Sequence, residues 1–138
     1  MRKRTKSREF ALQVLYQMDI TRDNCDTALT NFWQSQSAEL PDEDLRDFTS
    51  AIVRGVIQNL VMIDGKIAQY AANWQLERMA VVDRNILRMG CFELLFRDDI
   101  PPKVSINEAV ELAKKYSTQE AGKFVNAILD KIKIEKEK

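Results

Sequence analysis

The feature that most constrains this chain is a long run of apolar residues spaced three or four positions apart. Its members are Leu45, Phe48, Ile52, Val56, Leu60, Ile63, Ile67 and Tyr70. This spacing places all eight side chains on one face of an α-helix and does not fit the alternation of a β-strand. Because the run is long for one globular helix and contains Gly55 and Gly65, we expect a break near Met62–Gly65.

The rest of the chain also favours helices, because 138 residues contain only four glycines and three prolines. Apolar periodicity predicts helices over residues 6–19, 27–36 and 81–96. Two further helices follow the capping-box patterns Ser105–Glu108 and Ser117–Glu120, in which a hydroxyl and a carboxylate satisfy free N–H groups. We therefore predict an all-α fold of about six or seven helices. Residues 1–138 form a single domain, with an N-terminal half of about 1–75 and a C-terminal half of about 76–134.

The ends of several helices are marked by particular residues. Asp42 is a candidate N-cap for the long periodic run, since its side chain can accept a hydrogen bond from a free N–H group. Pro101 and Pro102 end the predicted helix over residues 81–96, because proline cannot continue a helix. The lysine-rich segment Lys131–Lys138 is expected to fray.

The charge is unevenly distributed although the net charge is zero. The first eight residues contain five basic residues and no acid, and the remaining 130 residues carry 16 basic and 21 acidic side chains. A basic arm on a mildly acidic body is expected of a protein that binds a polyanion. A short basic N-terminus can also serve solubility alone, and this feature does not decide between the two. The arm consists of Arg2, Lys3, Arg4, Lys6 and Arg8.

The residues that usually carry catalysis are largely missing. There is no histidine, no glycine-rich phosphate loop and no pair of cysteines at metal-binding spacing. The acidic clusters Asp42–Asp44 and Asp98–Asp99 are more typical of a helix start and a turn than of metal ligands. We expect no enzymatic activity, no cofactor and no metal. Cys25 and Cys91 are expected to be reduced thiols of a cytoplasmic protein, because the chain has neither a secretory signal nor a membrane-spanning apolar run.

Other side chains could bind unpaired RNA, because arginines neutralise phosphates and aromatic rings stack on bases. Arg84 and Arg88 are four residues apart and share one helix face. On spacing alone, however, they are more easily explained by salt bridges to Asp83 or Glu77. Tyr16 and Phe124 have a similar alternative, since an aromatic side chain at helical spacing usually lies in the core.

Four segments resemble the NusB family of transcription antitermination factors. They are Arg8–Gln17, Val82–Arg88, Val104–Lys114 and Lys123–Asp130, and the resemblance runs in register from the basic arm to Lys133. The Ile-Asn-Glu-Ala and Lys-Phe-Val-Asn stretches are its specific parts. The chain departs from the family at Ala127 and Ser117, where the family has glycine, so local packing there is expected to differ by about one methyl group.

The resemblance implies two small helical bundles and a non-enzymatic role. It implies binding to boxA, a short single-stranded RNA segment, together with the ribosomal protein NusE. It also implies that the protein acts with other Nus factors on the RNA polymerase elongation complex to disfavour termination, chiefly on ribosomal RNA operons. Both a monomer and a homodimer are open. The implied RNA contacts are the basic arm, Arg88, Phe124 and, less directly, Arg84; the implied NusE contacts are Tyr16 and Asp83.

Two alternatives to this interpretation are open. The chain could be a helical protein-interaction module whose basic arm is incidental. It could also be an RNA-binding domain related to that of RNA cytosine methyltransferases, although 138 residues leave no room for a cofactor-binding α/β domain. A partner interaction that is insensitive to salt and independent of RNA would favour the first alternative.

Overall fold

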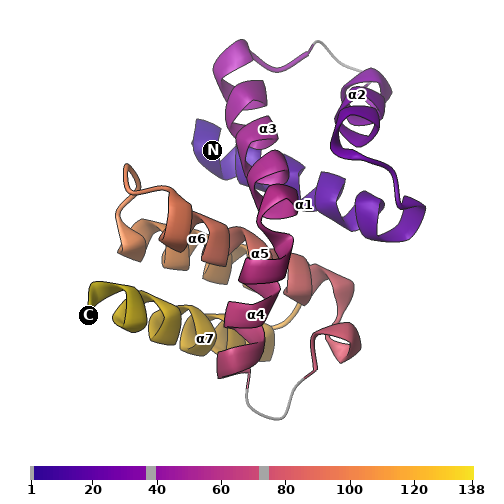
Figure 1. Cartoon of the computed structure of the whole chain (residues 1–138). Helices are drawn as coiled ribbons and strands as arrows, with labels where there is room; N and C mark the ends of the chain where they lie inside the picture. The colour runs from indigo at the N-terminus through magenta and orange to yellow at the C-terminus, as the bar shows by residue number, and fades with distance from the viewer. Residues whose placement is uncertain (1, 37–39, 72–74) are drawn as a thin grey trace.

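The computed structural model describes residues 2–36, 40–71 and 75–138, which form seven α-helices, one short 3₁₀ helix and no strand (Figure 1). The predicted all-α fold is therefore confirmed. The helices are α1 (Lys3–Thr21), α2 (Cys25–Ser35), α3 (Glu43–Gln58), α4 (Leu60–Tyr70), α5 (Val81–Phe96), α6 (Pro102–Tyr116) and α7 (Gln119–Glu137), and the 3₁₀ helix η1 covers Leu76–Arg78.

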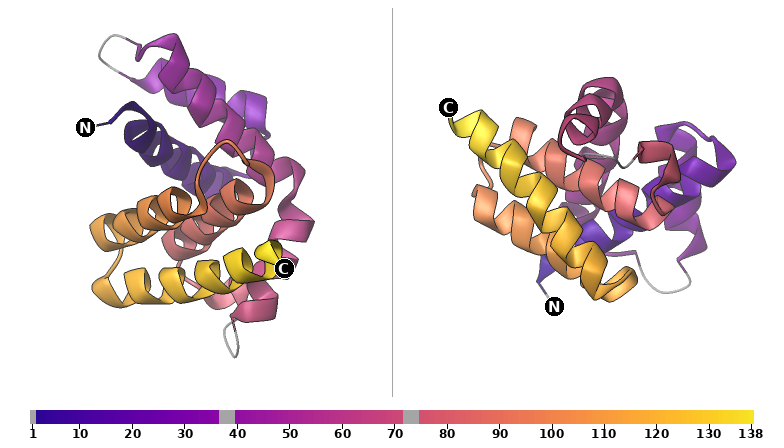
Figure 2. Two further views of the ribbon diagram at one scale, coloured as in Figure 1. Left: turned by 90° about the vertical axis from the view of Figure 1, so that its left-hand side faces the viewer. Right: turned by 90° about the horizontal axis from the view of Figure 1, so that it is seen from below.

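The central element is α5, which packs against α1, α3, α4, α6 and α7. Helices α1, α2 and α3 lie together on one side of it, and α6 and α7 form a hairpin on the other (Figures 1 and 2). One continuous hydrophobic core joins both groups. Although α4 belongs to the predicted N-terminal half, it packs against α5 and α7. The division into halves near residue 75 stays a prediction.

The long periodic run is broken at Asn59, so the predicted break at Met62–Gly65 is wrong by a few residues. Asn59 leaves helical geometry with φ −115° and ψ 21°. Its side-chain Nδ2 donates a hydrogen bond to the Gly55 carbonyl at 2.8 Å, so the asparagine amide competes with the backbone for that acceptor. Gly55 has a packing role, because an added Cβ would lie 2.1 Å from a ring carbon of Phe92 on α5. Gly65 has open space around it and does not end α4.

The start of each helix tests the predicted caps. Asp42 caps α3 as predicted, accepting a hydrogen bond from the Leu45 N–H at 2.9 Å. The last helix also begins where expected, but its cap is Thr118, which accepts from the Ala121 N–H at 2.9 Å. The capping box at Ser105–Glu108 is wrong, because α6 already begins at Pro102. Proline suits the first helical position, where its missing N–H is not needed and its φ is already helical.

The prediction that the C-terminal lysine-rich segment frays is wrong. Helix α7 extends to Glu137 because its last turns are tied to two other elements. Lys136 Nζ donates to the Leu94 carbonyl at 2.6 Å and forms an ion pair with Asp98 at 2.7 Å. The Tyr70 hydroxyl of α4 donates to Glu135 at 2.6 Å.

Helix α1 is covered on more than one side. Ala11, Val14 and Leu15 are buried along one face, and Leu12 on another side is buried as well. Near the N-terminus, the buried Thr49 hydroxyl of α3 donates to the Ser7 carbonyl at 3.1 Å. The first turns of α1 are thus held rigidly against the body.

Candidate nucleic-acid interface

The basic arm is not a flexible tail, because four of its five residues lie within helix α1. Arg2 is the N-cap residue and is exposed, and the helix begins at Lys3. The side chains of Lys3, Arg4 and Lys6 are about half exposed, at 50, 52 and 44 %. A helix that begins in the arm fixes the direction of these cations.

Arg8 differs from the rest of the arm because its side chain is only 3 % exposed. Its guanidinium donates two hydrogen bonds to the Glu93 carboxylate of α5, both at 2.8 Å, and a third to Glu108 of α6 at 3.0 Å. The Ser105 hydroxyl of α6 donates to the same Glu93 carboxylate at 2.8 Å. This buried cluster uses the two residues, Ser105 and Glu108, that the sequence pattern assigned to a capping box. Arg8 therefore joins α1 to α5 and α6 rather than facing solvent.

Carboxylates from other elements lie beside the exposed cations. Lys3 Nζ is 3.1 Å from Asp42 at the start of α3, and its hydrogen bond to that carboxylate raises the pKa of Lys3. The pKa of Asp42 is lowered first by the Leu45 backbone N–H and then by Lys3. Arg4 Nη1 is 4.0 Å from Asp99 in the α5–α6 turn. A bound polyanion would compete with these exposed pairs.

An aromatic ring lies among three arginines beside the arm, and nothing in the sequence pattern pointed to it. The guanidinium carbons of Arg4, Arg8 and Arg97 lie 4.4, 5.2 and 5.2 Å from the centre of the Phe48 ring. Arg97 forms two hydrogen bonds of 2.9 Å with Asp99 and thereby lowers the pKa of that carboxyl to about 2. Residues from α1, α3 and the end of α5 meet here through tertiary packing alone, so helical spacing could not have revealed the cluster.

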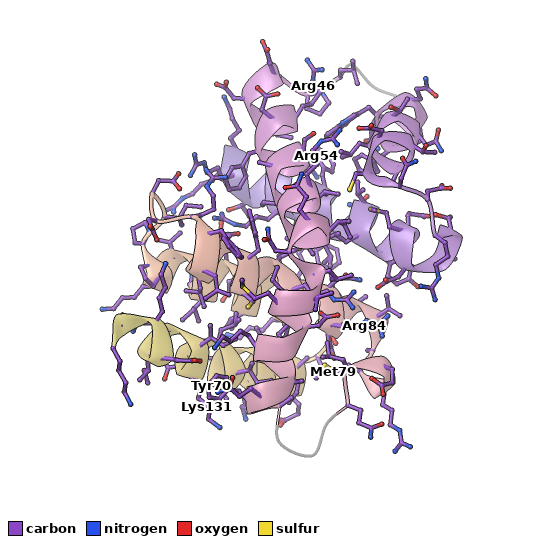
Figure 3. All side chains as sticks on the ribbon, in the orientation of Figure 1. Arg46, Arg54, Tyr70, Met79, Arg84 and Lys131 are labelled. Carbon is purple, nitrogen blue, oxygen red and sulfur yellow. The ribbon has the colours of Figure 1, made fainter. Side chains whose placement is uncertain are left out.

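Arg84 and Arg88 share one face of α5, as predicted, but their predicted salt-bridge partners are wrong. Both guanidiniums bind Asp19 near the end of α1, at 3.2 and 3.4 Å. Arg88 also forms a two-point contact with Asp64 of α4, at 2.8 and 2.9 Å. Burial alone would raise the pKa of Asp19, but hydrogen bonds from Asn85 and Arg84 and the charge of Arg88 lower it. The pair is largely buried between helices, with Arg84 labelled in Figure 3.

Phe124 and Asp83, which the sequence assigned to different partners, line the same hollow of about 360 Å³. Met79 and Thr118 also border this hollow, between the start of α5 and the start of α7. Phe124 is partly exposed, while one carboxylate oxygen of Asp83 is buried without a hydrogen-bond partner. Tyr16 on α1 is 38 % exposed and lies one turn before Asp19.

The end of α6 adds further groups that sequence spacing did not single out. Lys115 Nζ forms a hydrogen bond with Glu9 of α1, and Lys6 Nζ is 3.6 Å from the other oxygen of the same carboxylate. Burial raises the pKa of Glu9, but hydrogen bonds from Lys115 and Tyr116 bring it below its usual value. Lys115 and Tyr116 are both exposed. Cations from α1 and α6 therefore share one carboxylate at the edge of the arm.

The described residues contain neither a metal-binding cluster nor a membrane-spanning helix. No group of three or more histidine, cysteine, aspartate or glutamate side chains there could hold a metal ion. Across residues 2–36, 40–71 and 75–138, no helix has the length and apolar character needed to cross a membrane.

An all-helical body with a rigid, half-exposed basic helix end is typical of small proteins that bind polyanions by charge. Comparison with known proteins then identifies the family. The family model described as "NusB family" matches residues 5–133, so the chain belongs to the NusB family.

The relatives of known name agree with this assignment. The chain is 48 % identical over 130 residues to the transcription antitermination protein NusB of Anaeromyxobacter dehalogenans, covering 94 % of this chain and 89 % of that protein. It is similar to the solved structure of T. maritima NusB, with a TM-score of 0.86 and 40 % identity over 96 % of this chain and 91 % of that one. A structure of antitermination factors NusB and NusE in complex with dsRNA has a TM-score of 0.86 and 29 % identity, each chain being covered to 98 %.

Proposed function

We propose that this protein is a transcription antitermination factor that binds boxA single-stranded RNA together with NusE. The observation that carries the proposal is the set of half-exposed cations Lys3, Arg4 and Lys6, fixed in the first turns of α1. Such groups neutralise phosphates, and each contact releases bound counterions from the nucleic acid. A relative solved with NusE and dsRNA supports NusE and RNA as partners.

The RNA contacts are divided among residues according to their surroundings. Arg2, Lys3, Arg4 and Lys6 contact phosphates, and the Phe124 ring stacks on an unpaired base. Arg8 was also assigned to RNA, but its buried bonds to Glu93 favour a role in holding the helix end in place.

The remaining assigned residues are proposed for the later helices and for NusE. Arg84 and Arg88 support the RNA surface from α5 while bound to Asp19. Tyr16 and Asp83 are proposed to contact NusE. Because Asp83 lines the same hollow as Phe124, the RNA and NusE surfaces would adjoin at the start of α5.

The proposed mechanism is one of binding rather than catalysis. The protein and NusE clamp boxA RNA as it leaves RNA polymerase in the cytoplasm and hold it on the elongation complex with other Nus factors. This tether disfavours termination, chiefly on ribosomal RNA operons. RNA displaces Asp42 and Asp99 from the exposed cations at little cost, since water and salt screen exposed ion pairs.

Fluorescence anisotropy of a labelled boxA RNA, titrated with this protein with and without NusE, tests the proposal. A scrambled RNA of the same length and composition is the control. We expect tighter binding to boxA than to the scrambled RNA and a further gain when NusE is present. Equal, weak and salt-driven binding to both RNAs would leave only a generic basic arm and would support the interaction-module alternative.

A further inference from the structure

A second basic surface lies in the groove between α6 and α7, and none of the residues assigned above to RNA or NusE lines it. The groove has a volume of about 510 Å³. Among the described residues, its lining contains one acid, Asp130, and four lysines, which are Lys103 and Lys114 from α6 and Lys123 and Lys133 from α7. Between Lys103 and Lys114 the helix rises about 17 Å, so the charge is spread along the groove rather than concentrated at one point.

The groove follows from how the hairpin packs. On α6 the lining positions 103, 107, 110 and 114 recur every three or four residues, as do positions 122, 126, 130 and 133 on α7, so each set forms one helix face. Ile106, Val110 and Gly122 form its apolar part. The helices approach closely at Gly122, where an added Cβ would lie 3.1 Å from Lys114 Cγ.

The lysines of this groove are weakly neutralised. Lys114 is 3.7 Å from Glu111 and Lys123 is 3.5 Å from Glu120, both on their own helices and strongly exposed. Exposed pairs of this kind are screened by water and salt and are easily exchanged. Within the described residues, Lys103 and Lys133 have no carboxylate within 4 Å. The groove is therefore positive along its length.

The chemistry of the groove favours a phosphate backbone. Lysine ammonium groups bind phosphates as point charges, and the amides of Asn107 and Asn126 can donate further hydrogen bonds. None of the described residues that line the groove is aromatic, so these residues offer no stacking surface for unpaired bases. It is suited to contact the backbone without reading sequence.

The position of the groove links it to the basic arm. One side of α6 contacts α1, where Glu108 binds Arg8, and another side forms the groove with α7. The left view of Figure 2 shows the start of α1, then α6, then α7 in order on one face of the molecule. An RNA strand bound at the basic arm can pass over α6 and reach the groove.

We propose that the α6–α7 groove binds the sugar–phosphate backbone of RNA that flanks the segment held by the basic arm, without base preference. This inference rests on the proposed RNA-binding function and extends it to a second surface. Four phosphate contacts on a single strand steepen the log–log salt dependence of affinity by up to about 2.8.

The test compares two RNAs, boxA alone and boxA extended by about ten nucleotides of unstructured flank. We expect the extended RNA to bind the unmodified protein at least about tenfold more tightly at low salt. The variant Lys103→Gln/Lys114→Gln/Lys123→Gln/Lys133→Gln is expected to lose that gain but to bind the short RNA as before. Asp130→Asn is expected to change the extended-RNA affinity in the opposite direction and to strengthen it.

Lys131→Gln is the matched control, because this exposed lysine of α7 does not line the groove and its loss should not change the gain. A gain that survives in the fourfold variant, or equal affinity of the unmodified protein for both RNAs, would overturn the groove proposal alone. Failure of the short RNA to bind at all would instead contradict the proposed function. Thermal melting establishes that each variant is folded.

Discussion

Arg4 and Arg8 are one helical turn apart in the same basic stretch, yet one is exposed and the other is buried in an ion pair. Arg4 is half exposed and only 4.0 Å from an exposed carboxylate, whereas Arg8 is 3 % exposed and held by Glu93 and Glu108. The sequence shows that both are basic but not which one is buried. That difference depends on Glu93, which is 85 positions away and meets Arg8 only in the folded chain.

Replacing Arg8 is therefore expected to affect stability far more than replacing Arg4. Arg8→Met leaves the buried Glu93 charge without its partner, which should lower the free energy of unfolding by about 3–5 kcal/mol. Arg4→Met, the matched control, should change it by less than about 1 kcal/mol. Urea unfolding followed by circular dichroism measures both.

The double variant Arg8→Met/Glu93→Leu refines this prediction. Removing both charges should recover part of the lost stability, because the fully buried Glu93 charge is then no longer present without its partner. Equal effects of Arg8→Met and Arg4→Met would show that the buried ion pair does not hold the arm.

The two cysteines also differ by their surroundings. They are free thiols, as predicted, with Cys91 fully buried and Cys25 only partly so. Burial raises the pKa of Cys91 from 9.0 to about 12 and also raises that of Cys25. The folded state therefore retains the Cys91 proton at a pH where an unfolded chain loses it.

This difference predicts both reactivity and pH dependence. Only Cys25 should react promptly with a thiol reagent in the folded protein, and both thiols should react in urea. Between pH 9 and 12 the unfolded state binds fewer protons at Cys91, so this thiol lowers stability by about 1.4 kcal/mol per pH unit. Urea unfolding at several alkaline pH values, with Cys91→Ala as the control, measures the slope. Equal reaction rates of the two thiols in the folded state would contradict the assignment.

At the scale of helices, apolar spacing predicted where the elements lie better than where they end. Helix α5 was predicted over its observed range, because its apolar positions face a core on several sides. The break was predicted too far along the chain, because glycine content points to Gly65, whereas the helix is interrupted by the Asn59 side chain, which bonds to the backbone. The predicted fraying of Lys131–Lys138 is wrong because Lys136 binds the Leu94 carbonyl of α5 and Asp98 just after that helix, and no local pattern reveals these acceptors.

The two departures from the family's glycines have simple local explanations. Ala127 is exposed on α7, so its methyl group does not enter the core. Ser117 has φ −132°, outside the left-handed region that favours glycine. Neither position requires glycine in this chain.

The capping of α7 gives a prediction at the same scale. Thr118→Ala should destabilise the protein by about 1 kcal/mol, because the Ala121 N–H loses its acceptor. Ser117→Ala is the neighbouring control and should change stability by less than about 0.5 kcal/mol, since no described side-chain hydrogen bond of Ser117 caps the helix. Thermal melting of both variants is the measurement. A larger loss for Ser117→Ala would support the capping box read from the sequence.

At the scale of the whole molecule, charge placement in the sequence predicts the basic arm as a candidate site. It does not predict which residues from other helices lie beside the arm. Phe48, Arg97 and Lys115 come from three other helices or their ends and meet the arm only through packing. The family resemblance implied that Arg84 and Arg88 contact RNA, while the structure places them between α1, α4 and α5. Their role in RNA binding stays a prediction.

The salt dependence of RNA affinity reports how many arm residues contact phosphates. Five contacts on a single strand would give a log–log slope of about −3.5, and four would give about −2.8. With Arg8 bound to Glu93, we expect the smaller value for boxA RNA without flanks. Arg2→Gln/Lys3→Gln/Arg4→Gln/Lys6→Gln should then nearly abolish the salt dependence, while its melting temperature stays close to that of the unmodified protein. A slope near −3.5, of which about −0.7 remains in the fourfold variant, would mean that Arg8 leaves Glu93 to reach RNA, so that binding and the α1–α5 contact are coupled.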